Sequence, residues 1–74
     1  MAIRYKISEL IDKKEKVEGR KISQASIARD IGVQRSAINK LINDDNYVTT
    51  TSTLDLLCNY FGCKIEDLIE HTKD

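Results

Sequence analysis

The segment from Gln24 to Ile42, QASIARDIGVQRSAINKLI, restricts the fold of this chain more than any other feature. Apolar residues recur with helical spacing over residues 24–31 and again over residues 35–43. The turn between these two helices has only three or four residues, which forces the helices to cross steeply. The crossing needs a small residue at the contact and a turn residue that tolerates positive φ, and Ala28 and Gly32 satisfy both needs. Val33, Ile38 and Leu41 are expected to hold the second helix against the first.

Helical periodicity predicts three further helices, which makes five in all. They are expected at about residues 6–16, 51–61 and 65–71. Ser23 is the predicted N-cap of the helix at 24–31. Loops are expected at residues 17–22 and at Asn43–Asn46, and residues 47–51 are expected to be extended. The predicted buried residues are Ile7, Leu10, Ile11, Ile27, Ala28, Ile31, Ile38, Leu41, Ile42, Leu54, Leu57, Cys58, Phe61, Ile65, Leu68 and Ile69, with Ile38 and Leu57 at the centre.

Size and composition favour one soluble helical domain. The chain has 74 residues, of which 41% are hydrophobic and 32% are charged, and it contains no proline. No apolar run approaches the roughly 18 residues of a membrane span, and no secretory leader is evident at the N-terminus. We therefore expect no membrane partner and a cytoplasmic location.

The charge is zero overall but unevenly distributed along the chain. Residues 1–40 contain ten Lys/Arg and five Asp/Glu, whereas residues 41–74 contain two Lys/Arg and seven Asp/Glu. The two parts therefore carry +5 and −5. One interpretation is a basic binding face opposed to an acidic one; the other is chance segregation on a solvated surface.

Residues that could support catalysis or metal binding are few. Cys58 and Cys63, the only two cysteines, do not match a zinc-binding spacing, and the single histidine, His71, completes no ligand set. We expect Cys58 to be buried and unpaired, and His71 to be solvated at a helix end. No nucleophile–base pair or carboxylate pair is evident. The sequence thus predicts neither an enzyme nor a cofactor site.

The side chains on the outward face of the predicted helix at 35–43 indicate what that helix could bind. At about 100° per residue, five polar side chains share an arc of about 140°; they are Arg35, Ser36, Asn39, Lys40 and Asn43. This arc contains no carboxylate. Arg and Lys suit guanine or phosphate, and Asn suits adenine. The alternative is a polar surface helix in a small bundle.

These residues resemble a known family. The stretch GV-x-x-SAINK-x-I at Gly32–Ile42 is similar to the helix-turn-helix of the Cro and phage-repressor family, also called Xre regulators. The C-terminal LDLLCNYFGCKIEDLIE and the opening MAIRYKISELI are similar to small domains of this type. The resemblance implies an all-α, five-helix, lambda-repressor-like helix-turn-helix domain over residues 1–74. Its second and third helices would bind double-stranded DNA.

The resemblance also assigns roles to particular residues. Gln24 would bind a phosphate at the start of the second helix. Base edges and adjoining phosphates would be contacted by Gln34, Arg35, Ser36, Asn39 and Lys40, with Asn43 on the same face, and Ala37 would meet a thymine methyl group. Two departures stand out. Gln34 replaces the usual Ser/Thr-like N-cap, and Asp44 and Asp45 put the phosphate contacts of their loop in doubt.

The predicted function is therefore a sequence-specific transcriptional regulator, with repression as the favoured direction. The alternative is an antitoxin-like or other interaction module whose acidic half binds a protein partner. Regulators of this type usually bind as homodimers to two half-sites. Ile3, Tyr5 and Ile7 alternate, so the N-terminus is either a strand in a dimer contact or an ordinary packed terminus. We favour the packed terminus.

Overall fold

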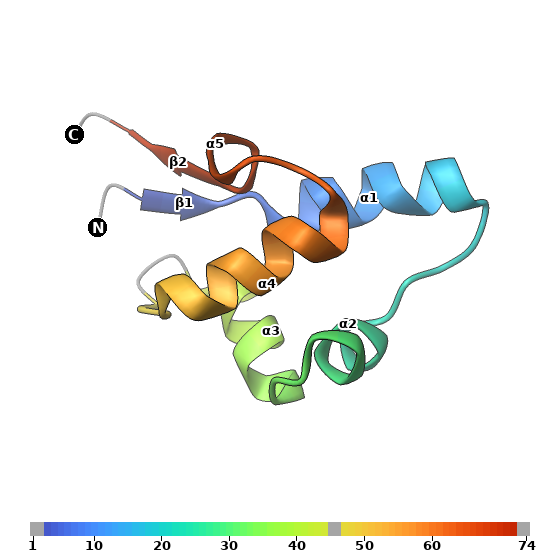
Figure 1. Cartoon of the computed structure of the whole chain (residues 1–74), viewed down its shortest axis with the longest axis horizontal. Coiled ribbons are helices and arrows are strands. Elements are labelled where there is room, and N and C mark those ends of the chain that lie inside the picture. The colour runs from blue at the N-terminus through green and yellow to red at the C-terminus, as the bar shows by residue number, and fades with distance from the viewer. Residues whose placement is uncertain (1–2, 45–46, 73–74) are drawn as a thin grey trace.

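The computed structural model describes residues 3–44 and 47–72. Over these residues the elements follow the order β1 (Ile3–Tyr5), α1 (Ile7–Glu18), α2 (Gln24–Ile31), α3 (Arg35–Asn43), α4 (Thr51–Phe61), α5 (Ile65–Leu68) and β2 (Ile69–His71). Figure 1 shows α2 and α3 at one end of the molecule and the two strands at the other, with α4 between them. The predicted turn residues Asp45 and Asn46 lie outside the described residues.

Local capping determines where the middle helices begin and end. The Ser23 hydroxyl accepts the Ser26 N–H at 3.0 Å, as predicted, and Thr50 caps α4 in the same way. Gly32 ends α2 at φ +78°, a left-handed conformation that a side chain disfavours. Its N–H donates to the Ala28 carbonyl at 2.9 Å. These caps explain why the predicted bounds of α2 and α4 are confirmed, and α3 also has its predicted bounds.

The first helix is longer than predicted. It continues to Glu18 instead of ending near Lys16. Lys14 and Glu18 form an ion pair at 2.6 Å, one turn apart, which favours the extra turn. Gly19 then ends α1 in a left-handed conformation, and its N–H donates to the Glu15 carbonyl at 2.8 Å.

The fifth helix is shorter than predicted. It ends at Leu68, and Ile69–His71 form β2, which pairs antiparallel with β1 in the register Tyr5 to Ile69 and Ile3 to His71. The predicted helix to His71 is therefore wrong, because main-chain hydrogen bonds from the distant N-terminus take the place of helical ones. His71 is exposed, but it lies in a strand rather than at a helix end. The other five elements in the described residues are helices.

The paired strands fit the packed-terminus interpretation of the N-terminus. β1 is used within its own chain, as the packed-terminus interpretation expects. On the exposed side of the pair, the Arg4 guanidinium lies 2.8 Å from a Glu9 oxygen and 3.5 Å from a Glu70 oxygen. The Tyr5 hydroxyl donates to the Tyr47 carbonyl at 2.7 Å, which joins β1 to the segment before α4.

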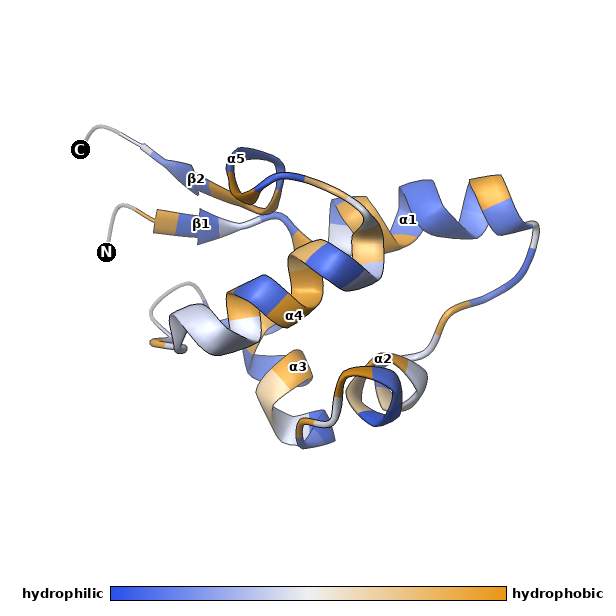
Figure 2. Ribbon diagram, viewed as in Figure 1, coloured by the Kyte–Doolittle hydropathy of each residue, from blue (hydrophilic) through white to orange (hydrophobic). Residues whose placement is uncertain are grey.

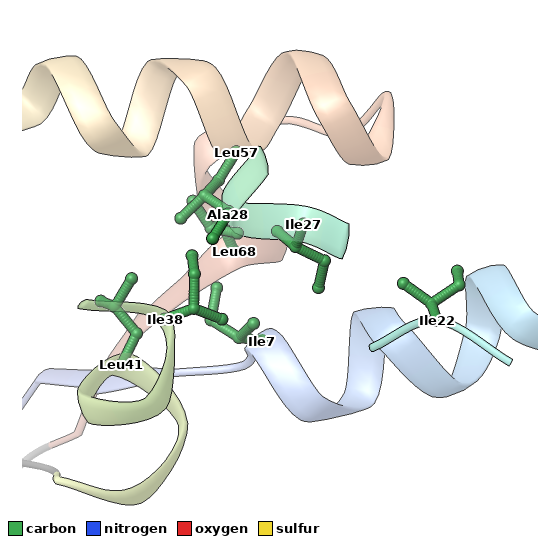
Figure 3. Packing of buried hydrophobic residues seen from close by; sticks show 8 residues of the cluster. All are labelled: Ile7, Ile22, Ile27, Ala28, Ile38, Leu41, Leu57 and Leu68. Carbon is green, nitrogen blue, oxygen red and sulfur yellow. The ribbon is translucent and has the colours of Figure 1, made fainter. Parts of the chain in front are cut away.

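The core is a single cluster supplied by every helix (Figure 3). Its buried members are Ile7, Ile22, Ile27, Ala28, Ile38, Leu41, Leu57 and Leu68. Ile38 and Leu57 are both fully buried, which confirms their predicted central position. Ile22 was expected only as a loop residue; its backbone N–H donates to a Glu15 carboxylate oxygen at 2.7 Å, and its side chain lies beside α1.

Several predicted core residues are less buried than expected. Ile65 is wrong as a core residue, because 46% of it is exposed at the start of the short α5. Half-buried residues pack around the core instead of inside it: Leu10, Ile11, Ile31, Ile42, Leu54, Cys58, Phe61 and Ile69. Among the described residues, no helix is both long enough and apolar enough to cross a membrane.

We predict that Leu57→Ala lowers the free energy of unfolding by about 2–5 kcal/mol, because it leaves a cavity in the centre of the core. The neighbouring Leu56 is 39% exposed and serves as a matched control. Leu56→Ala removes the same atoms and should cost less than about 1 kcal/mol. Urea unfolding measures both losses, and equal losses would contradict the described register of α4.

Candidate nucleic-acid interface

Helices α2 and α3 meet as the sequence predicted. Figure 1 views α2 almost along its axis while α3 runs across the view, so the helices cross steeply. Ala28 is 4% exposed, and its small side chain permits the close approach. The N–H groups of Gly32 and Val33 both donate to the Ala28 carbonyl, at 2.9 and 3.0 Å, which fixes the turn between the helices.

The inward and outward faces of α3 are clearly separated. Ile38 and Leu41 are buried, whereas the predicted arc of Arg35, Ser36, Asn39, Lys40 and Asn43 is exposed throughout. Figure 2 shows hydrophilic and hydrophobic residues alternating along this helix. Gln34 is exposed just before α3, and Ala37 is half-buried on its flank. The structure thus brings the α3 candidates onto one accessible surface, which we call the α3 face.

A pair of asparagines lies in the middle of the α3 face. Asn43 Nδ2 donates to Asn39 Oδ1 at 2.8 Å and to the Asn39 carbonyl at 3.1 Å. This contact fixes the Asn39 amide, because its oxygen is held toward Asn43 and its Nδ2 group is turned away. Within the described residues, Asn39 Nδ2 donates to no protein acceptor. The amide is therefore held ready to act as a donor to a ligand.

The start of α3 lacks a side-chain cap. Gln34 occupies the N-cap position in an extended conformation and makes no capping hydrogen bond. The Ser36 hydroxyl lies 3.5 Å from Gln34 Oε1, at the limit of a hydrogen bond. The Ala37 N–H donates to the Gln34 carbonyl at 3.0 Å, whereas the N–H groups of Arg35 and Ser36 are left to solvent or to a ligand. This is consistent with the weak cap expected for glutamine.

Lys40 lies at the edge of the α3 face beside an aromatic ring. Its Nζ is 5.7 Å from the centre of the Tyr47 ring, within the range of a cation–π contact. An exposed contact of this kind contributes only about 0.5–1 kcal/mol, so the ammonium can move to a phosphate at little cost. The sequence did not indicate Tyr47 as a site residue, because the distance between Tyr47 and Lys40 depends on how the chain turns after α3.

Gln24 belongs to a second helix of the site. It is the first residue of α2 and is half-buried. The first N–H groups of any helix have no partner within it. Ser23 accepts only the Ser26 N–H, so the N–H groups of Gln24 and Ala25 are not satisfied by this cap. Helix N-termini with free N–H groups suit phosphate. Among the described residues, no hydrogen bond links Gln24 to the candidates on α3.

The positive charges near the two helices are largely unneutralised. Lys21 and Arg35 form no ion pair with a carboxylate in residues 3–44 or 47–72, whereas Arg4, Lys14 and Arg20 are each paired elsewhere. Arg29 has only the adjacent Asp30 carboxylate, at 3.9 Å. Asp44 is exposed just after α3, as the sequence suggested, and Asp45 lies outside the described residues.

Two crossed helices with this spacing, a carboxylate-free exposed face and a free helix start form a DNA-binding helix-turn-helix. A family model for the Cro/C1-type helix-turn-helix DNA-binding domain matches residues 6–74. The chain belongs to this family. It is therefore a DNA-binding domain of the Cro/C1 type. No curated protein matched the chain in a sequence comparison.

In this Cro/C1-type domain the N-cap residue of α3, Gln34, makes no capping hydrogen bond. We therefore predict that Gln34→Ser stabilises the domain. A serine hydroxyl can accept the N–H of Ala37, and a good N-cap is worth about 1 kcal/mol. The reference is Ser23→Ala, which removes the cap of α2 and should cost about 1 kcal/mol. Urea unfolding compares both variants, and a destabilised Gln34→Ser would show that Gln34 has a structural role.

Proposed function

We propose that this Cro/C1-type domain is a sequence-specific transcriptional repressor that binds as a homodimer and places the α3 face in the DNA major groove. The observation that carries the proposal is the carboxylate-free α3 face, with its Asn39–Asn43 amide pair. Arg35 offers a planar fork for guanine, and Asn39 offers a donor and an acceptor for adenine. A solvated helix in a chain with equal numbers of acidic and basic residues would normally expose some carboxylates.

The other site residues take supporting roles in this proposal. Gln24 and the start of α2 bind a backbone phosphate, which fixes the register of the domain on the duplex. Gln34 and Ser36 contact base edges or phosphates beside the first turn of α3. Ala37 meets a thymine methyl group through its exposed part, and Lys40 moves from the Tyr47 ring to a phosphate.

The length of α3 is our argument for a homodimer. Nine helical residues span about 13 Å, or about four base pairs of duplex. Four base pairs recur too often to define one site among the roughly 10⁶ or more competing sites of a genome. Two copies reading adjacent half-sites about one helical turn apart supply the missing specificity.

The arrangement of the elements supports our proposal of repression. The described residues share one core, and the proposed DNA contacts come from α2 and α3 within it. A pair of such domains bound over a promoter excludes other proteins by occupying the duplex. We propose this direct occlusion as the regulatory mechanism.

We expect Asn39→Ala to weaken binding to the preferred site by about 1–3 kcal/mol and to remove the preference at one base position, because a bidentate amide–adenine pair is lost. Asn43→Ala should cause a smaller loss at the same position, since it frees the Asn39 amide to rotate. The measurement selects a site from random duplex DNA, then compares affinities for every single-base change.

Asn59→Ala is the matched control for this experiment. Asn59 is an exposed asparagine on α4, outside the α3 face, so its loss should leave the base preferences unchanged. Ile38→Ala is a second control, which should lower stability without altering base preference. If Asn39→Ala keeps the wild-type affinity and profile, α3 does not read the sequence and the proposal fails.

We also predict a strong salt dependence of DNA binding, although the whole chain is neutral. Each phosphate neutralised by a Lys or Arg contributes about −0.9 to the slope of log K against log salt concentration. Lys40→Ala should therefore weaken all sequences alike and reduce the slope by about one. Binding at several salt concentrations, to both the selected and a random duplex, measures both effects.

Lys13→Ala removes an equal charge at a distant position and serves as the control. Lys13 lines a groove between α1 and the turn after α4, away from the α3 face. Its loss should leave the salt slope nearly unchanged. A wild-type slope near zero would contradict the proposal and favour the alternative of an acidic surface that binds a protein partner.

A further inference from the structure

The turn between α4 and α5 holds the only two cysteines of the chain next to each other. Gly62 ends α4 at φ +64°, and the N–H groups of Gly62 and Cys63 both donate to the Cys58 carbonyl. The Cys63 bond is the 6→1 bond of the Schellman motif and the Gly62 bond is the 5→1 bond of the αL motif; in such helix ends the residue after the glycine often contacts a residue in the last turn of the helix. Those two positions are Cys63 and Cys58.

The backbone hydrogen bond limits how far apart the cysteines lie. Cys63 N is 3.0 Å from the Cys58 carbonyl oxygen, so ordinary bond lengths keep the two Cα atoms within about 7 Å of each other. Disulfides usually join Cα atoms about 4.4–6.8 Å apart. Cys58 is also near enough to raise the pKa of the Cys63 thiol. Both thiols are free and only half-buried, so a small reagent can reach them.

An access route leads to one of the two thiols. Cys63 lines a groove of about 480 Å³ between α1 and the α4–α5 turn, together with Lys13, Phe61 and Asp67. This groove is separate from the α3 face. The same turn at the end of α2 has alanine and valine in the two equivalent positions, Ala28 and Val33, which pack as ordinary apolar residues.

We propose that Cys58 and Cys63 close reversibly into an intramolecular disulfide when the domain meets a low-molecular-weight disulfide such as oxidised glutathione. The Cys63 thiolate, which lines the groove, attacks one glutathione sulfur and releases one glutathione thiolate. The Cys58 thiolate then attacks Cys63 Sγ, forms the Cys58–Cys63 bond and releases the second glutathione. The two cysteines are oxidised, the glutathione disulfide is reduced to two thiols, and the cysteine protons pass to these products. The bond ties the turn before α5 covalently to the last turn of α4.

The surroundings of Cys63 determine the pH at which the pair closes. Burial raises the pKa of the Cys63 thiol, and Cys58 on α4 and Asp67 on α5 raise it further, while Lys13 on α1 opposes them weakly. Because only the thiolate attacks, closing is slow near neutral pH and its rate rises roughly tenfold per pH unit below that pKa. The pair therefore stays reduced unless the oxidant is sustained.

The test incubates the folded chain with oxidised and reduced glutathione at graded ratios, followed by acid quenching, alkylation and mass spectrometry. We expect the wild type to lose both alkylatable thiols without gaining glutathione. Cys58→Ser and Cys63→Ser should each carry one glutathione adduct. A variant with Cys58→Ser and Asn59→Cys keeps two thiols but moves one about 100° around α4. Closing this pair should need at least about tenfold more oxidised glutathione.

The outcomes decide the proposal in either direction. Closure of the wild type at lower oxidant ratios than the displaced pair supports it, as does reopening by reduced glutathione. Glutathione adducts without an intramolecular bond in the wild type would overturn it. Equal closure of the displaced pair would also overturn it, because proximity in the turn would then not be the cause. Circular dichroism melts confirm that each variant is folded during the reaction.

Discussion

The burial of Ile38 and Leu41, on the inner face of α3, is the constraint on which the rest of this structure depends. With these two side chains held in the core, the opposite side of the helix has one fixed direction. The steep crossing with α2 adds a second constraint, since only a small residue such as Ala28 permits it. Together they turn a nine-residue helix, which would be unstable alone, into a rigid support for polar side chains.

The α3 face has side chains held in place by neighbours and a helix start whose first N–H groups lack a side-chain cap, and both features suit a ligand. Asn43 holds the Asn39 amide by two hydrogen bonds, and Tyr47 holds the Lys40 ammonium weakly. The start of the helix, by contrast, is left uncapped at Gln34. A chain selected only for stability would place serine or threonine there. The missing cap is therefore consistent with a surface shaped by DNA contact.

A small sheet joins the N-terminal strand β1 to the C-terminal strand β2. Pairing of β1 with β2 brings Arg4 against Glu9 and Glu70, and the Tyr5 hydroxyl reaches the Tyr47 carbonyl. These ion pairs are exposed and individually weak. They join β1 to α1 and β2, whereas the Tyr5–Tyr47 hydrogen bond connects β1 to the segment that follows α3.

The sequence alone determined the features that depend on nearby residues. Ala28, Gly32 and the apolar spacing of residues 24–43 predicted the crossed pair, and Ser23 and Gly62 marked helix ends that the structure confirms. The polar arc of α3 followed from periodicity, since a helix rotates about 100° per residue wherever it lies. The family resemblance rested on the same residues and was confirmed, whereas the DNA contacts of individual side chains stay predictions.

Only the tertiary structure decided the features that depend on distant residues. Ile69–His71 left the helical pattern because Ile3–Tyr5, more than sixty residues away, offered a strand to pair with. Ile65 fitted the apolar pattern but is exposed, since the short α5 turns only Leu68 fully into the core. Ile22 and Tyr47 reach their contacts because of the path that their loops follow, and the spacing of nearby residues does not predict that path. Helical periodicity is a property of neighbouring residues, whereas strand pairing and burial depend on what the rest of the chain brings near.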